Sequence, residues 1–280
     1  MSISISGMST TLALQLIDAT KSQQLSLTQN DPANARAITN FKKEAASITS
    51  AKDFVNNYDV YNFVMDAFNL QAEAPGKALI QKTLESDPNK TGSLISATSN
   101  PNITALFNSV GFAVGGTGGN FADTNWQNTI VQKYVSQQFI NDESSQNSAV
   151  GTALEFEQKA SSIKSWYDVL DNANLTQFFQ TALGLPSAMS GQPLDQQIKE
   201  LSSKFDITTL SDPKVVSSLV QKFAVLSDAQ NGTMSGTQSS ILTLISSAVS
   251  AGSGKGQYIP ATLDITSINF SALSASNLYG

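Results

Sequence analysis

The sequence predicts an all-α protein with two tandem copies of a small helical repeat unit, joined by a long helix and flanked by extended N- and C-terminal segments. Apolar residues recur at helical spacing through most of the 280 residues, whereas alternation with period two is brief. Residues 41–70 align without a gap on residues 156–185, with ten of thirty positions identical. A repeat of this length indicates a duplicated small domain rather than an array of many short units.

The first half of the chain is expected to hold a terminal helix and one copy of the unit. A first helix is predicted over 9–28, with Leu12, Leu16, Ile17 and Ala19 facing inward. Asp31-Pro32 combines an N-cap residue with a proline suited to the first helical position, so a second helix starts there and runs to about Ile48. A flexible glycine-rich joint is expected over 111–120. The other helices of this half are predicted over 50–56, 59–70, 76–85 and 103–110.

The second half is expected to begin with the joining helix and to repeat the same plan. Apolar or small residues from Trp126 to about Ile163 predict a long helix, either continuous or broken at its polar middle, 141–148. Further helices are predicted over 165–171, 174–185, 194–205, 215–226 and 235–252. The resulting division is a terminal segment and helix (1–30), repeat unit 1 (31–122), the connecting helix (123–152), repeat unit 2 (153–252) and an extended tail (253–280).

The composition excludes most common catalytic and cofactor chemistries. Histidine and cysteine are both absent, which removes Cys/His zinc sites, haem ligation by His or Cys, iron–sulfur clusters, disulfides and Ser-His-Asp triads. The net charge of −6 argues against nucleic-acid binding, which needs a positive footprint. No apolar run approaches the ~18 residues of a membrane span. We expect no catalytic residue, metal, cofactor, nucleic acid or membrane insertion.

Polar residues kept by both copies are expected to cap helices or to bond within turns. Asp53 aligns with Asp168, and Asn57 aligns with Asn172, each at a predicted helix boundary. The alternative is an enzyme that uses Asp53 and Asp168 as a carboxylate pair in one pocket. The loop that begins at Asp87 imitates an EF-hand, but its twelfth position lacks the bidentate glutamate, which favours a polar turn.

Three strings of the first copy carry a resemblance to a known family. They are ITSAKDFVNNY (48–58), YNFVMDAFNL (61–70) and ALIQKTLESDP (78–88). Over 38–112, and again over 153–226, the chain resembles the alphaproteobacterial family 1217 of domains of unknown function, whose members are often encoded among flagellar genes. The resemblance implies a flagellum-associated protein and transfers no catalytic residue.

The function predicted from these features is a non-enzymatic structural or assembly protein of the bacterial flagellum. The uncharged residues 1–17 are similar to an uncleaved type III export signal, so the protein is expected in the flagellum; the alternative is a cytoplasmic adaptor or chaperone-like protein for flagellar export substrates. The partners would be other flagellar proteins, with the oligomeric state open. The terminal segments either fold onto such partners or pack on the chain's own helices. The candidate partner-binding residues are Ile3, Ile5, Leu12 and Leu16 at one end and Leu263, Ile265, Ile268, Phe270 and Leu273 at the other.

Overall fold

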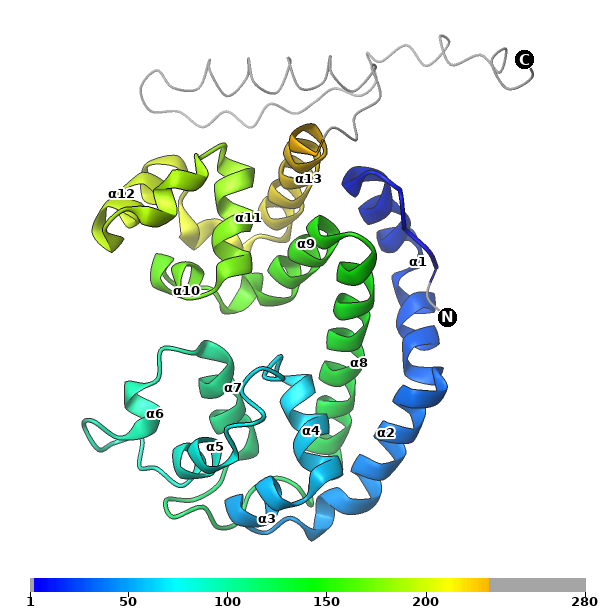
Figure 1. Cartoon of the computed structure of the whole chain (residues 1–280), viewed down its shortest axis with the longest axis vertical. Coiled ribbons are helices and arrows are strands. Elements are labelled where there is room, and N and C mark those ends of the chain that lie inside the picture. The colour runs from blue at the N-terminus through cyan, green and yellow to red at the C-terminus, as the bar shows by residue number, and fades with distance from the viewer. Residues whose placement is uncertain (1–2, 232–280) are drawn as a thin grey trace. The chain divides into compact units, whose positions relative to one another are not determined.

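The structure is a computed structural model that describes residues 3–231, all within one compact unit of the chain (Figure 1). The expected all-α class is confirmed, because the described residues contain helices and only two isolated β-bridges. None of these helices combines the length and the apolar character needed to cross a membrane. The α-helices are α1 (Thr10–Asn30), α2 (Pro32–Glu44), α3 (Ala51–Asn56), α4 (Tyr58–Ala67), α5 (Lys77–Leu84), α6 (Leu94–Ala97), α7 (Pro101–Val110), α8 (Thr124–Gln146), α9 (Ser148–Lys159), α10 (Trp166–Leu170), α11 (Ala173–Leu183), α12 (Leu194–Lys204) and α13 (Pro213–Gln230); the 3-10 turns are η1 (Ala45–Ser47), η2 (Ala160–Ser162), η3 (Ser187–Gly191) and η4 (Ile207–Ser211).

Two hydrophobic cores divide the described residues into two lobes. We call the part formed by α2–α7 with the first half of α8 the first lobe, and the part formed by α9–α13 with the start of α1 and the end of α8 the second lobe. In the first core Phe41 stacks on Phe63 with ring centroids 4.4 Å apart, and Phe63 stacks on Tyr134. In the second core Phe156 stacks on Phe178 at 3.9 Å. The same two identical positions of the repeat therefore pack face to face in both cores.

The aligned segments form the same series of local elements. A helix, a 3-10 turn, a short helix and a longer helix follow one another as α2, η1, α3 and α4, and again as α9, η2, α10 and α11. Ser50 and Ser165 cap the short helices, whereas Asn57 and Asn172 cap the longer ones. The expected capping role of both asparagines is confirmed. That the lobes are tandem copies over their full length stays a prediction.

The joining helix is broken at the polar middle, which was the second of the two alternatives. It ends at Gln146, and Asn147 adopts an extended backbone while its side chain caps α9. Gly151 lies so close to Ser144 that an added Cβ would come within 2.8 Å of the Ser144 Cα. The break therefore lets α9 fold back against the end of α8, as Figure 1 shows.

The glycine-rich stretch 111–120 is docked rather than a flexible joint, which corrects the expectation. The carbonyl of Gly116 accepts the Ala51 N–H at 2.7 Å, and the Gly118 N–H donates to the Thr49 carbonyl at 2.9 Å. Gly116 has φ +78° and is buried, so a side chain there would be strained and would clash. The glycines allow the backbone to lie against the start of α3.

The inward face of α1 agrees with the prediction at two of its four residues. Ile17 is buried in the second core and Leu16 packs against it, as predicted, whereas Leu12 is 53% exposed and Ala19 is also exposed. The other buried apolar residues of this helix are Ala13 and Leu14. The segment has apolar residues on several adjacent faces, so the helical period alone does not choose between them. Contacts with α9 and α13 select the face that is buried.

A buried carboxylate without a hydrogen-bond partner lies on α8. Both oxygens of Glu143 are buried and accept no hydrogen bond from the described residues. Gln24 Oε1 and Thr28 Oγ1 on the neighbouring helix α1 are also buried without partners. Burial, together with the nearby charge of Asp142, raises the pKa of Glu143 to about 7. Helix α8, which packs on α1, thus carries a buried acid without a hydrogen-bond partner among residues 3–231.

We expect Glu143→Gln to stabilise the protein above neutral pH. The pKa of Glu143 is higher in the folded than in the unfolded chain, so wild-type stability is fully present below the ordinary glutamate pKa and falls as pH rises through about 7. At pH 8 the variant should gain about 1–2 kcal/mol in the free energy of unfolding, and at pH 5 its gain should vanish. Urea unfolding between pH 5 and pH 8 measures this. Glu200→Gln, which replaces a half-buried glutamate on α12, is the control for the removal of a carboxylate. A gain for Glu143→Gln at pH 5 as large as at pH 8 would contradict the prediction.

Candidate functional site

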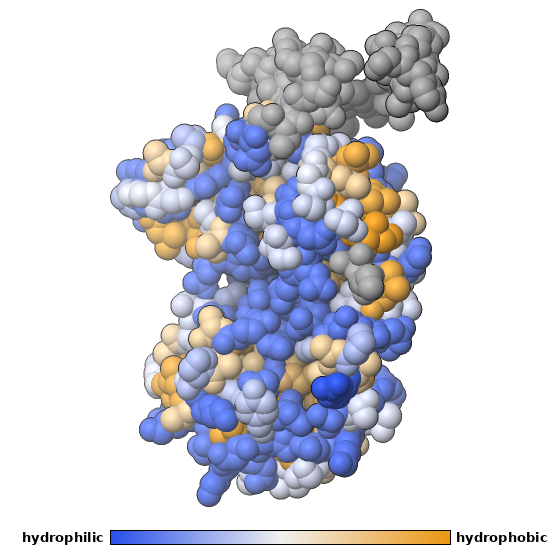
Figure 2. Space-filling view, turned by 45° about the vertical axis from the view of Figure 1, so that its right-hand side comes forward, coloured by the Kyte–Doolittle hydropathy of each residue, from blue (hydrophilic) through white to orange (hydrophobic). Residues whose placement is uncertain are grey.

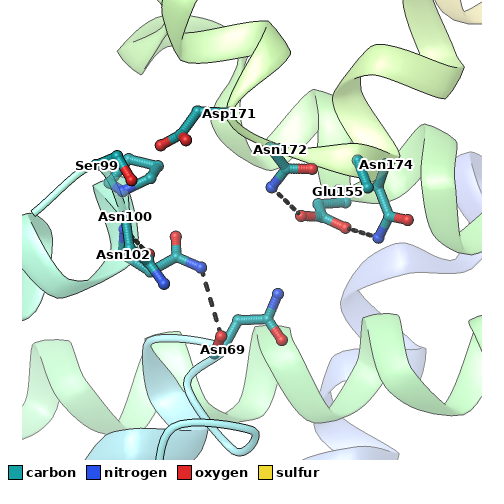
Figure 3. A pocket seen from close by; sticks show the side chains of 10 residues that line it. Asn69, Ser99, Asn100, Asn102, Glu155, Asp171, Asn172 and Asn174 are labelled. Atoms are coloured by element: carbon teal, nitrogen blue, oxygen red, sulfur yellow. Dashed lines mark hydrogen bonds between the residues drawn. The ribbon is translucent and has the colours of Figure 1, made fainter. Parts of the chain in front are cut away.

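A polar cleft of about 380 Å³ lies between the two lobes. Figure 3 shows side chains of both lobes around it, and Figure 2 shows a hydrophilic band on the surface between the lobes. One wall comes from the ends of α4 and α6 and the start of α7, and the other from α9, the end of α10 and the start of α11. The lining residues are Asn69, Ser99, Asn100, Pro101 and Asn102 from the first lobe and Glu155, Asp171, Asn172, Ala173 and Asn174 from the second.

The wall from the first lobe consists of asparagines fixed by turns and a helix cap. Asn69 follows α4 with φ +54°, the one positive φ of a non-glycine residue among residues 3–231. Asparagine tolerates this conformation better than other side chains do. Asn102 donates from Nδ2 to the Asn69 carbonyl at 3.4 Å, and Asn100 caps α7 while donating to Glu73 at 2.9 Å. Side-chain hydrogen bonds therefore connect the start of α7 to the segment that follows α4.

The wall from the second lobe is organised by Glu155, which is 5% exposed. Its Oε1 accepts hydrogen bonds from Asn172 at 3.1 Å and from the Lys159 ammonium at 2.8 Å, and its Oε2 accepts one from Asn174 at 2.5 Å. Desolvation alone would raise the pKa of Glu155, but the Lys159 charge and the three hydrogen bonds outweigh it and lower that pKa. Glu155 is thus an ionised residue that positions two asparagines of the cleft.

The charge of the lining is negative. Glu155 and Asp171 are acidic, and no lysine or arginine is among the lining residues. Lys159, behind the wall, is paired with Glu155. Asp171 is exposed, and its carboxylate makes no hydrogen bond or ion pair with the described part of the chain. One uncompensated carboxylate therefore remains among several amide groups.

The duplicated acids predicted from the sequence lie elsewhere and act within turns. Asp53 accepts from the Thr49 hydroxyl at 2.9 Å, and Asp168 accepts from the backbone N–H groups of Lys164 and Ser165, both at 2.8 Å. Neither lines the cleft. The expected bonding role of both acids is confirmed, and the structure does not bring them together in the pocket that the enzyme alternative required.

The N-terminal candidate residues lie on the chain itself as far as they are described. Ile5 is completely buried in the second core, and its N–H donates to Gln146 Oε1 at 2.9 Å, whereas Ile3 is half-buried. Ile5 therefore packs on the chain's own helices, which was one of the two alternatives for the terminal segments. Partner binding by Ile3 stays a prediction. The predicted helix 235–252 and the candidates Leu263, Ile265, Ile268, Phe270 and Leu273 lie outside the described residues.

The EF-hand-like loop forms a polar turn. Asp87 Oδ1 accepts the Asn89 N–H at 2.8 Å, which is the bond of an Asx turn. Between residues 3 and 231 no three acidic side chains gather in a way that would hold a metal ion. The loop carries no further candidate chemistry.

The sequence predicted helix caps that line the cleft but did not predict the cleft itself. Asn172 was identified from the repeat, whereas Asn69, Asn102, Glu155 and Asp171 were not. Glu155 aligns with Asn40 of the first copy, so the alignment gave no sign of its importance. The available signal was the high density of asparagine at the starts of helices, which predicts caps but not that caps from two lobes face each other.

Comparison with known proteins gives a family and a fold relative. A family model described as "Protein of unknown function (DUF1217)" matches residues 67–216 in one stretch, which includes both walls of the cleft. A crystal structure of a structural-genomics target from Agrobacterium tumefaciens is similar, with a TM-score of 0.72 and 26% identity, over 82% of this chain and 98% of that one. No curated protein matches the chain.

Proposed function

Since this chain belongs to the DUF1217 family of proteins of unknown function, we propose that it is a non-enzymatic structural or assembly protein of the bacterial flagellum that works through protein–protein contacts. The flagellar association is supported by the resemblance to a family often encoded among flagellar genes and by the absence of cysteine with an uncharged N-terminal segment. The contact role is supported by the cleft between the lobes.

The lining of the cleft is the observation that carries this proposal. Five of its ten residues are asparagines, and the side-chain amides of Asn69, Asn102 and Asn174 keep groups that could bond to the peptide groups and polar side chains of another chain. The lining holds no cysteine, histidine or lysine, and Glu155, one of its two acids, is already bonded to Lys159, Asn172 and Asn174. Such a lining favours recognition by hydrogen bonds over covalent chemistry.

A cytoplasmic adaptor for flagellar export substrates is the second candidate, and the position of the N-terminal segment favours it. In the folded chain Ile5 is completely buried and Ala13, Leu14 and Ile17 belong to the same core, so a signal at these residues would be accessible only before folding. A chain that folds before it is exported is suited to remaining in the cytoplasm.

Deletion of the gene, with complementation, tests the flagellar proposal. We expect flagella that are changed in number, length or motility, and crosslinking with mass spectrometry in intact cells should connect the protein to hook, basal-body or export components. Normal flagella and motility would refute the proposal. Detection in sheared flagella would favour the structural role, whereas detection only in the cytoplasmic fraction would favour the adaptor.

A further inference from the structure

We propose that the cleft between the lobes binds an arginine side chain of a partner protein, with the Asp171 carboxylate as its counter-charge. This proposal rests on the proposed contact role and specifies the chemistry that the contact site recognises. It follows from the charge of the cleft and from hydrogen-bond acceptors on both walls that no residue between 3 and 231 uses.

The charge of the cleft calls for a cation. Asp171 has no partner among residues 3–231, while the charge of Glu155 is already matched by Lys159 at 2.8 Å. The starts of α7 and α11 reach the cleft, and their dipoles favour anions. The Asn100 side chain accepts the N–H groups of Asn102 and Ile103 at the start of α7, whereas the Asn172 side chain accepts only the Leu175 N–H at the start of α11. The single full charge of the lining that no described residue matches is negative, and it outweighs the partial positive charge at the start of α11.

Several hydrogen-bond acceptors of the cleft are not used by the described residues. Asn102 and Asn174 use Nδ2 within the chain, at the Asn69 carbonyl and at Glu155, which leaves their Oδ1 atoms without a bond to the described residues. With Asp171 they provide acceptors from both lobes. A guanidinium has five N–H donors in a fixed planar fork and no acceptor, so it matches acceptors from opposite walls better than a compact ammonium does.

The turn at Asn69 helps to position one of these acceptors. Asn69 follows the end of α4, and its carbonyl accepts the Asn102 Nδ2 donor, which fixes the position of the Asn102 Oδ1. The cavity volume of about 380 Å³ lies within the range of pockets that take small ligands.

Titration of the ¹⁵N-labelled full chain, followed by NMR, tests the proposal. The probe is N-acetyl-L-arginine amide, and the matched control is N-acetyl-L-citrulline amide, which has nearly the same shape without the charge. We expect saturable shifts of the side-chain NH₂ signals of Asn69, Asn102 and Asn174 with a millimolar dissociation constant, and a much weaker response to citrulline.

Asp171→Asn should weaken arginine binding about tenfold, because it removes the charge of one hydrogen-bonded pair. Asp171 is exposed and its carboxylate makes no bond within residues 3–231, so this variant is expected to fold normally. Asp195→Asn, which neutralises an exposed acid on α12, should bind like the wild type. Absence of saturable shifts, an equal response to citrulline, or unchanged binding by Asp171→Asn would each overturn the proposal.

The two proposals fail in different measurements. Arginine binding by the purified chain together with normal flagella in the deletion strain would keep the arginine site and remove the flagellar role. A flagellar defect together with no arginine binding would keep the flagellar role and remove the arginine site.

Discussion

Replacement of Glu155 with alanine is expected to lower the free energy of unfolding by about 3–5 kcal/mol. The change removes the acceptor of Asn172, Asn174 and Lys159 at once, and it leaves the Lys159 ammonium at 16% side-chain exposure without its partner. A buried charge left unpaired is what makes such a truncation costly. Urea unfolding followed by circular dichroism measures the loss.

Glu157→Ala is the matched control for this prediction. Glu157 is on the same helix and pairs with Lys21 at 3.4 Å, but both side chains are more exposed, so its loss should cost less than about 1 kcal/mol. The double variant Glu155→Ala/Lys159→Ala should recover part of the stability, because it removes the stranded charge. Equal costs for Glu155→Ala and Glu157→Ala would refute the central role given to Glu155.

The stabilisation by Glu155 also depends on pH. The pKa of Glu155 is lower in the folded chain than its ordinary value, so its contribution is present above the unfolded-state pKa and is lost as pH falls through the lowered value. Wild-type stability should therefore decline in acid more steeply than that of Glu155→Ala. Parallel slopes for the two proteins below the ordinary glutamate pKa would contradict this assignment.

Replacement of Asp228 with alanine is expected to cost about 3 kcal/mol and to loosen the start of α1. The Asp228 carboxylate, 2% exposed on α13, accepts the Thr10 N–H at 2.6 Å, the Thr11 N–H at 3.0 Å and the Thr11 hydroxyl at 2.8 Å. Hydrogen bonds to a charged acceptor at a helix N-terminus are among the stronger ones, and their loss leaves buried donors unsatisfied. Urea unfolding gives the energy, and limited proteolysis near the N-terminus gives the location.

Two further variants test whether the cost comes from the hydrogen bonds of Asp228. These are Asp228→Asn and the control Asp195→Asn. In Asp228→Asn the amide would keep one acceptor oxygen, so about half of the cost is expected, whereas neutralisation of the exposed Asp195 should leave stability within about 0.5 kcal/mol. Cleavage of Asp228→Ala at sites spread evenly along the chain, rather than near α1, would refute the view that Asp228 tethers this helix.

The helices of the described residues were largely predictable because their signals are local. Asp31-Pro32, Asn100-Pro101 and Asp212-Pro213 each mark a helix start, and α2, α7 and α13 begin at these prolines. The capping roles of Ser50 and Asn57 each depend on a residue three positions away. Interactions over such short separations leave a pattern that a single sequence can reveal.

The candidate site was not predictable from the same patterns. Asn69 and Asn102 are 33 positions apart, and Glu155 belongs to the other lobe. The tether of α1 joins residues separated by more than 200 positions. The periodicity and spacing of residues in a chain do not indicate which distant polar groups will form hydrogen bonds or line the same cleft.

By itself, the sequence determined the helical class, most helix starts and the exclusion of histidine and cysteine chemistry, because these depend on composition and on contacts within a few residues. Only the tertiary structure decided that α9 folds back at Asn147, that the glycine-rich stretch docks on α3, and that caps from two lobes form one cleft around Glu155 and Asp171. The physical reason is that these outcomes depend on close packing and on the pairing of buried polar groups between segments distant in the chain.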